Sequence, residues 1–80
     1  MTALKPVYLQ KVKQQNMSAI LREIWAHDSI SRVELVELTG LTSGTITNLT
    51  QELLRIGLIR ESETSSGSVG RKRTMLQLRT

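Results

Sequence analysis

The chain has 80 residues, no cysteine and a formal net charge of +4 at pH 7. This length suits one small domain, and the lack of cysteine excludes disulfides and thiolate metal sites and fits a reducing cytoplasm. No apolar run approaches the roughly 20 residues of a membrane span, and the N-terminus lacks a signal-peptide pattern. With one Trp, one Tyr and no Phe, the core must consist of Leu, Ile and Val, and a deep small-molecule pocket is not expected.

Basic residues gather at the two ends of the chain. Residues 1–27 carry four basic side chains and one acid, and residues 60–80 carry five basic side chains and two acids. Residues 28–56 between them carry two basic side chains and four acids. Such an imbalance usually marks only a solvated surface. It becomes a nucleic-acid footprint when the fold brings the basic segments to one face.

A first helix is predicted over about residues 7–27. Pro6 suits its first turn, where a missing N–H costs nothing. Apolar residues recur at helical spacing along it: Leu9, Val12, Met17, Ile20, Leu21 and Ile24. His27 near its end is interpreted as a surface or capping residue, because no second His, Cys or paired acid stands at ligand spacing.

A second helix is predicted over residues 32–39. Ser31 and Glu34 form the S-x-x-E pattern of a capping box, in which each side chain accepts a hydrogen bond from the other residue's backbone N–H. Gly40 then ends the helix by adopting the left-handed conformation. Two leucines are expected to face the core: Leu35 and Leu38.

A third helix is predicted over residues 43–56, with Thr42 as its N-cap and Gly57 after its end. The stripe expected to be buried consists of Ile46, Leu49, Leu53 and Ile56. The opposite face is polar but nearly uncharged, and it holds Gly44, Thr47, Asn48, Gln51 and Arg55. A solvated helix face would ordinarily carry more Glu and Lys.

A β-hairpin is predicted over about residues 58–80. Residues 58–63 indicate a strand, residues 64–70 form a turn segment rich in Ser and Gly, and residues 74–80 indicate a returning strand. The predicted fold class is therefore mainly α with a small β-hairpin, in one domain spanning residues 1–80. Three helices followed by such a wing, with a short glycine turn between the second and third, predict a winged helix-turn-helix.

The polar face of the third helix predicts contact with double-stranded DNA. Asn48 and Gln51 have the side chains that can bond both N6 and N7 of adenine, and Thr47 can touch a thymine methyl. Gly44 allows close approach of the backbone. No acid precedes Glu52 in this helix, so its positive dipole end is open to a phosphate. The expected phosphate contacts come from Arg32, Ser43, Thr45 and Arg55.

The wing predicts a second contact. Gly70 precedes three basic residues, Arg71, Lys72 and Arg73, which we expect near the tip of the hairpin. An arginine in a narrow minor groove gains from the enhanced negative potential there. Arg71 is therefore the predicted minor-groove residue, with Lys72 and Arg73 on the flanking backbone.

Most of the chain resembles the N-terminal DNA-binding domain of ROK-family bacterial repressors, which include xylose and N-acetylglucosamine repressors. The matching segments are Asn16 with Ile20–Leu21, then ISRVELVELTGLTSGTITNLTQELLRIGLI, then SVGRKRTMLQL. The resemblance implies a cytoplasmic repressor of sugar-metabolism genes, whose third helix enters the major groove and whose wing reaches the adjacent minor groove. In this family a proline commonly follows the Gly-Arg of the wing, and Arg73 stands near that place here.

The resemblance also implies a longer protein. The family continues into a sugar-kinase-like domain that binds the effector and supports homo-oligomers, so a chain ending at Thr80 is either a fragment or a free-standing small regulator. We expect the isolated domain to be a monomer or weak dimer. The operator is expected to be two-fold symmetric with A·T-rich flanks.

Two other classes of function remain to be weighed. Winged helices also serve as protein-interaction modules, and a weakly charged third helix could bind a protein partner without sequence-specific DNA binding. Enzymatic activity is not expected, because no paired carboxylates, Ser-His-Asp set or phosphate-binding loop can be assembled. No cofactor, metal ligand or catalytic residue is predicted.

Overall fold

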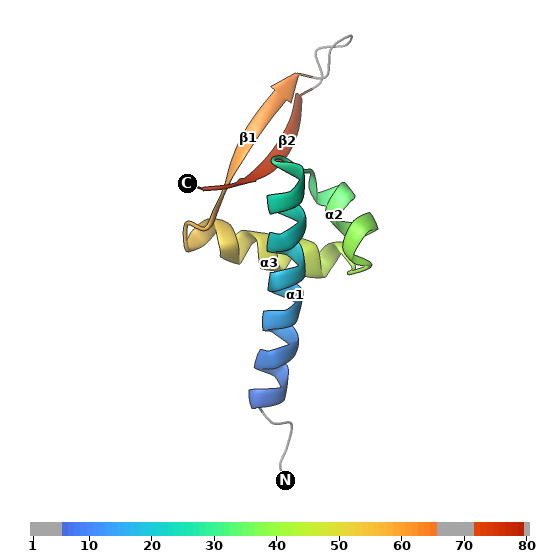
Figure 1. Ribbon diagram of the computed structural model, residues 1–80, viewed down its shortest axis with the longest axis vertical. Helices are drawn as coiled ribbons and strands as arrows, with labels where there is room; N and C mark the ends of the chain where they lie inside the picture. The colour runs from blue at the N-terminus through green and yellow to red at the C-terminus, as the bar shows by residue number, and fades with distance from the viewer. Residues whose placement is uncertain (1–5, 66–71, 80) are drawn as a thin grey trace.

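The computed structural model describes residues 6–65 and 72–79. In that part of the chain, three helices precede a two-stranded antiparallel sheet (Figure 1). The elements are α1 Pro6–His27, α2 Arg32–Thr39, α3 Ser43–Arg55, β1 Ile59–Ser65 and β2 Lys72–Leu78. The predicted fold class is confirmed, and each helix boundary lies within one residue of its expected position.

The predicted caps set the ends of α2 and α3. The capping box between Ser31 and Glu34 is present, and Gly40 follows α2 in the left-handed region with φ 75°. The Thr42 side chain accepts a hydrogen bond from the backbone N–H of Thr45 at the start of α3. Only two residues, Leu41 and Thr42, lie between Gly40 and α3, so the turn joining the two helices is short.

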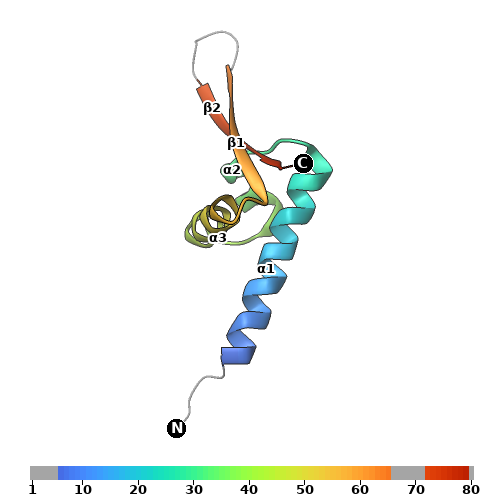
Figure 2. The ribbon, with the colours of Figure 1, turned by 90° about the vertical axis from the view of Figure 1, so that its left-hand side faces the viewer.

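The hairpin is joined to the helices by a backbone bridge at its base. The register of β1 and β2 runs from Ile59 opposite Leu78 to Ser65 opposite Lys72. Ile30, just before α2, exchanges two backbone hydrogen bonds with Leu76 of β2, at 3.0 and 2.8 Å. From this base the strands extend away from the helices (Figure 2).

The strands extend further toward the turn than the sequence predicts. The expected first strand ended at residue 63 and the second began at residue 74, whereas Thr64 pairs with Arg73 and Ser65 with Lys72. Lys72 and Arg73 therefore belong to β2, as its first two residues at the end of the strand nearest the turn. Ser and Gly mark where a chain can turn, but they do not fix how many residues pair before the turn begins. The other two expected tip residues, Gly70 and Arg71, lie outside the described residues.

The core draws on every element. Its nine buried apolar residues are Ile20, Ile24, Ile30, Leu35, Ile46, Leu49, Leu53, Ile59 and Leu76. They are all Leu or Ile, as the composition predicts. Met17, Leu21, Val36, Leu41, Leu54 and Leu78 pack around them. Burial of this cluster holds α3 between α1 and the base of the hairpin.

Two residues expected in the core are instead exposed. Leu38 is 50% exposed, because the inward side of α2 is formed by Leu35 with Val36 and Thr39, and Leu38 lies on the other side of Leu35. Ile56 is 52% exposed, because it is the C-cap residue and the chain turns at Gly57, with φ 83°. The apolar pattern was therefore wrong at one position in α2 and at the end of α3.

The first half of α1 projects beyond the other elements (Figures 1 and 2). Leu9 and Val12 at helical core spacing are 51% and 37% exposed, whereas Ile20 and Ile24 further along are fully buried. Among the described residues, no helix combines the length and apolar character needed to cross a bilayer.

Candidate nucleic-acid interface

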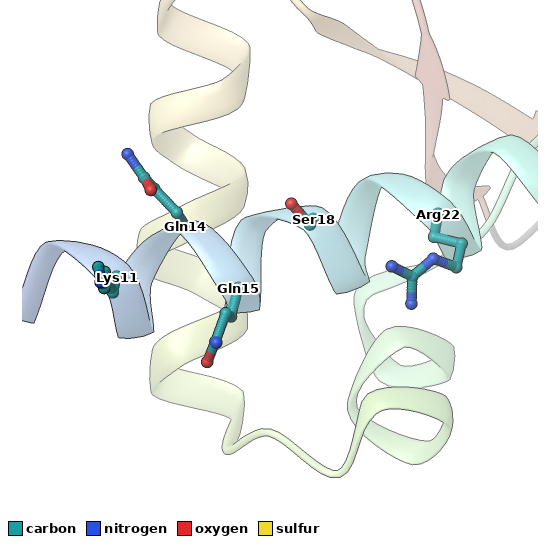
Figure 3. Close-up of a pocket in the computed structure, with 5 residues that line it drawn as sticks. All are labelled: Lys11, Gln14, Gln15, Ser18 and Arg22. Carbon is teal, nitrogen blue, oxygen red and sulfur yellow. The ribbon is translucent and has the colours of Figure 1, made fainter.

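A hollow of about 540 Å³ lies along the outer face of α1 (Figure 3). Its lining consists of Lys11, Gln14, Gln15, Ser18 and Arg22, all exposed and all from this one helix. Small-molecule sites are typically lined by apolar groups with a few convergent polar ones, and this surface has no such apolar lining. In the part of the chain that the structure describes, no group of His, Cys, Asp and Glu could hold a metal ion.

The outer face of α3 is the more distinctive surface. Its exposed residues are Ser43, Gly44, Thr47, Asn48, Gln51 and Arg55. They lie opposite the buried Ile46, Leu49 and Leu53. Within residues 6–65 and 72–79, the amide groups of Asn48 and Gln51 make no hydrogen bond. Both side chains are therefore available to an outside partner.

The start of α3 leaves backbone donors available. The Oγ1 of Thr42 accepts from Thr45 N over 3.1 Å, and the Thr42 hydroxyl donates to Thr45 Oγ1 over 3.0 Å. This cap satisfies one N–H of the first turn. Within the described residues, the backbone N–H groups of Ser43 and Gly44 have no acceptor, and such groups at a helix N-terminus suit a phosphate oxygen.

Nothing in the folded protein itself requires glycine at position 44. A Cβ placed there would meet no atom within 4 Å, and its φ is not positive. Neither packing nor backbone conformation in the folded chain therefore excludes a side chain at this position. A close approach by an outside molecule would explain it.

Glu52, the only acid of α3, is paired on the side that faces α1. Lys13 Nζ lies 2.8 Å from Glu52 Oε1. The hydrogen bond from Lys13 holds the pKa of Glu52 below its ordinary value, against the opposing effect of desolvation. This ion pair leaves the outer face of α3 without an unpaired carboxylate.

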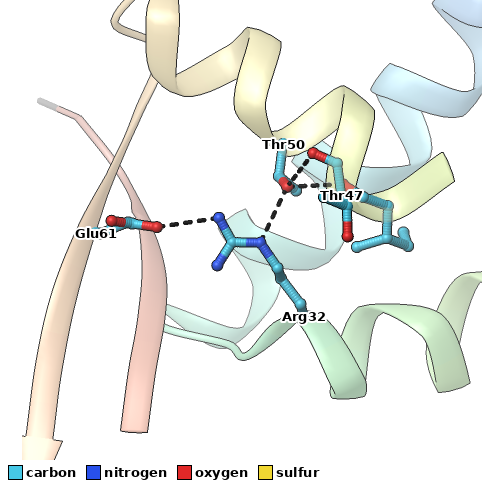
Figure 4. Close-up of polar contacts among 5 residues, drawn as sticks. Arg32, Thr47, Thr50 and Glu61 are labelled. Atoms are coloured by element: carbon cyan, nitrogen blue, oxygen red, sulfur yellow. Dashed lines mark hydrogen bonds and ion pairs between the residues drawn. The ribbon is translucent and has the colours of Figure 1, made fainter. Parts of the chain in front are cut away.

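Arg32 has internal partners that the sequence did not indicate (Figure 4). Its Nε donates to Thr50 Oγ1 over 3.3 Å, and its Nη2 donates to Glu61 Oε2 over 3.0 Å. The side chain is 28% exposed and extends between α3 and β1 rather than outward. The guanidinium expected to contact phosphate is thus joined to the protein itself.

The basic residues of the wing are only partly described. Arg73 is exposed on β2, and the backbone of Lys72 pairs with Ser65. The positive charge of Arg73 makes a minor contribution to the lowered pKa of Glu34, whose main cause is hydrogen bonding to Ser31. The positive charge of Arg73 on β2 therefore acts on the acid at the start of α2.

Residues 14–60 match the family of winged helix-turn-helix DNA-binding domains. The chain belongs to this family. The matched range runs from α1 to the beginning of β1 and so contains the whole of α2 and α3. The polar face of α3 is accordingly the outer face of the second helix of a helix-turn-helix.

The relatives of this winged helix include named repressors. It is 35% identical over 65 residues to the xylose repressor of Bacillus spizizenii, an alignment covering 81% of this chain and 17% of that protein. It is 34% identical over 67 residues to a putative xylose repressor of Caldicellulosiruptor sp., and this alignment covers 84% of this chain and 17% of that protein. It is 34% identical over 61 residues to the N-acetylglucosamine repressor of Escherichia coli O157:H7, and this alignment covers 76% of this chain and 15% of that protein. The resemblance to this group of repressors is confirmed, and the winged helix spans about a sixth of their length.

Three residues that shape the site were missed by sequence reasoning. Lys13, Thr50 and Glu61 act through contacts between elements that are distant in the chain. Thr50 had one signal in the sequence, because it stands four residues after Ile46 and three before Leu53, on the same helix face as the stripe expected to be buried. Lys13 and Glu61 lie in no recognisable motif.

Proposed function

We propose that this winged helix binds double-stranded DNA sequence-specifically by placing α3 in the major groove. The observation that carries the proposal is the outer face of α3, which is exposed, polar and free of unpaired acids along the 13 residues of the helix. A helix of this kind can lie against a polyanion and still present amides to base edges.

Contacts to bases and to phosphates would come from different parts of the face. Thr47, Asn48 and Gln51 would contact base edges in the major groove. Ser43, Thr45 and Arg55 would contact phosphates, and Gly44 would let the backbone approach. In the wing, Arg71 would enter the minor groove after Gly70, with Lys72 and Arg73 on the flanking phosphates.

The regulatory role would be repression of sugar-metabolism genes in the bacterial cytoplasm. Support comes from the names of the relatives, which are xylose and N-acetylglucosamine repressors. By the same analogy, a longer protein carrying this domain would form homo-oligomers on a two-fold operator. The isolated domain would be a monomer or weak dimer and would not respond to sugars.

Selection of bound duplexes from a random pool, using the 80-residue chain, tests DNA binding and yields the operator. We expect an enriched half-site, and an affinity for it that falls steeply as salt rises, since phosphate neutralisation releases counterions. Absence of enrichment, with no salt-dependent DNA binding, would instead favour a protein-interaction module. Measuring the affinity of the selected duplex against a scrambled one of equal length separates specific from non-specific binding.

A further inference from the structure

One guanidinium joins three elements of the domain. Arg32 is the first residue of α2, and it donates to Thr50 of α3 and to Glu61 of β1. The acceptor on α3 is itself held in place, because Thr50 is fully buried and its hydroxyl donates to Ile46 O over 2.7 Å. A planar guanidinium that is bonded at two of its nitrogens holds its two partners in a fixed orientation relative to each other.

The contact to β1 lies at the outermost point where the core reaches the wing. Glu61 lies two residues beyond the buried Ile59 on the same face of β1, directly opposite the buried Leu76 of β2. Leu76 is bonded to Ile30, so the helices hold β2 through this bridge and hold β1 through the Arg32–Glu61 pair at the position opposite. Attachment of both strands at this level fixes an angle of the hairpin that attachment of one strand leaves adjustable.

The charge of Glu61 is unexpected on a DNA-binding surface. Thr50 lies one turn from Thr47 and next to Gln51, two residues of the exposed face, so the pair lies beside that face. A carboxylate there repels DNA phosphates, so its presence calls for a reason other than DNA contact. Its ion pair with Arg32 is that reason.

We infer that Arg32 is a positioning residue, which sets the angle of the wing relative to α3 through Thr50 and Glu61 so that both can engage one duplex. This role rests on the proposed DNA binding and replaces the phosphate contact that the sequence predicts for Arg32. The main consequence is that removing the negative charge of Glu61 weakens specific DNA binding.

The test compares Arg32→Ala, Glu61→Ala and the double variant on the selected duplex. Each single variant should lose roughly threefold to fivefold in affinity, the range expected when a half-exposed ion pair is removed. The double variant should lose no more than the weaker-binding single variant, since both act through one contact. Arg32→Lys should behave like Arg32→Ala, because an ammonium cannot reproduce the two-point contact.

A direct phosphate contact by Arg32 makes opposite predictions. Glu61→Ala would then bind DNA more tightly, Arg32→Lys would be close to the parent, and Arg32→Ala would lower the salt slope by about one unit. Any of these results overturns the positioning role. Glu37→Ala, which removes an exposed acid of α2, controls for the general effect of charge.

Residual dipolar couplings of the backbone amides test the same inference without DNA. In Glu61→Ala, the couplings within α3 and within β1 should each fit the parent geometry, but the two elements should no longer share one alignment tensor. Unchanged relative orientation in that variant would refute the inference. Because this measurement needs no duplex, it remains informative even if the parent chain enriches no DNA sequence, which would count against the proposed function alone.

Discussion

Ser31 and Glu34 satisfy each other's backbone N–H groups, with Ser31 N donating to Glu34 Oε1 over 3.0 Å and Glu34 N donating to Ser31 Oγ over 3.2 Å. The hydrogen bonds from Ser31 hold the pKa of Glu34 below its ordinary value of 4.5. A carboxyl group whose pKa is lower in the folded state adds stability above its unfolded pKa, and that stability is lost as pH falls through the folded value.

The free energy of unfolding should therefore decrease as pH is lowered from about 5 toward 3, in the range below the ordinary carboxyl pKa. Glu34→Gln should keep the capping geometry, since an amide oxygen also accepts from Ser31 N, but should flatten this decrease. Urea titrations at a series of pH values measure both effects. A decrease as steep in Glu34→Gln as in the parent would contradict the assignment.

The Lys13–Glu52 pair should matter for DNA binding more than for folding. Lys13→Gln leaves the Glu52 carboxylate unpaired on α3, and its charge should then weaken binding to the selected duplex by a few-fold. Adding Glu52→Gln should restore the affinity, because no uncompensated charge remains. Fluorescence anisotropy at low and moderate salt measures the four affinities of this cycle, and a double variant as weak as Lys13→Gln would show that Lys13 itself contacts DNA.

Gln51 should contribute to sequence preference. Gln51→Ala should cost roughly 1–3 kcal/mol of binding free energy on the preferred site and relax one base position, because a bidentate contact to a base edge is lost. Competition between the selected duplex and its single-base variants locates the position. A loss of equal size on random DNA would mean that Gln51 orients the protein without contacting a base.

Gly44→Ala should separate stability from binding. Its site on α3 is open and not left-handed, so alanine should leave stability unchanged or raise it by up to about 1 kcal/mol, while its methyl group weakens DNA binding. Gly57→Ala is the matched control: its site is equally open but has φ 83°, so alanine should destabilise the fold by about 1–2 kcal/mol. Thermal melts and anisotropy measure the two properties; unaltered DNA affinity in Gly44→Ala would exclude close backbone approach.

Arg71 and Lys72 should differ in their effects on DNA binding. Arg71→Ala should reduce the preference for A·T over G·C pairs flanking the half-site, because a guanidinium suits a narrow minor groove. Lys72→Ala should weaken all sequences about equally and lower the salt slope by about one unit. Binding to duplexes with A·T or G·C flanks distinguishes the two. Equal losses on both flanks for Arg71→Ala would make this residue an electrostatic anchor only.

Local signals predicted the helices well. Ser31, Gly40 and Thr42 each act on groups within a few residues in the chain, so their caps follow from sequence alone. Apolar periodicity predicted burial less well at the end of a helix. Ile56 follows the spacing of the buried stripe but is exposed, because the chain turns directly after it. The pairing of Thr64 with Arg73 could not be predicted, because a register set at the base of the hairpin decides it.

The candidate site was predicted in part. The polar face of α3 is visible in sequence because exposure follows from its place opposite Ile46 and Leu49. The contact between Arg32 and Glu61 spans 29 positions of sequence. Ion pairs between distant segments have no periodicity, and any acid of the wing could have been the partner of Arg32. Only the tertiary arrangement identifies it.

The projecting first half of α1 has a consequence for local unfolding. An isolated helix shorter than about 12–15 residues is marginal in water, and the turns around Leu9 and Val12 have little tertiary support. Their amide hydrogens should exchange with solvent through fraying that leaves the core intact, whereas those near Ile20 and Ile24 should require global opening. One continuous helix would thus contain two regions of different protection, with the change near Met17, which packs against the core.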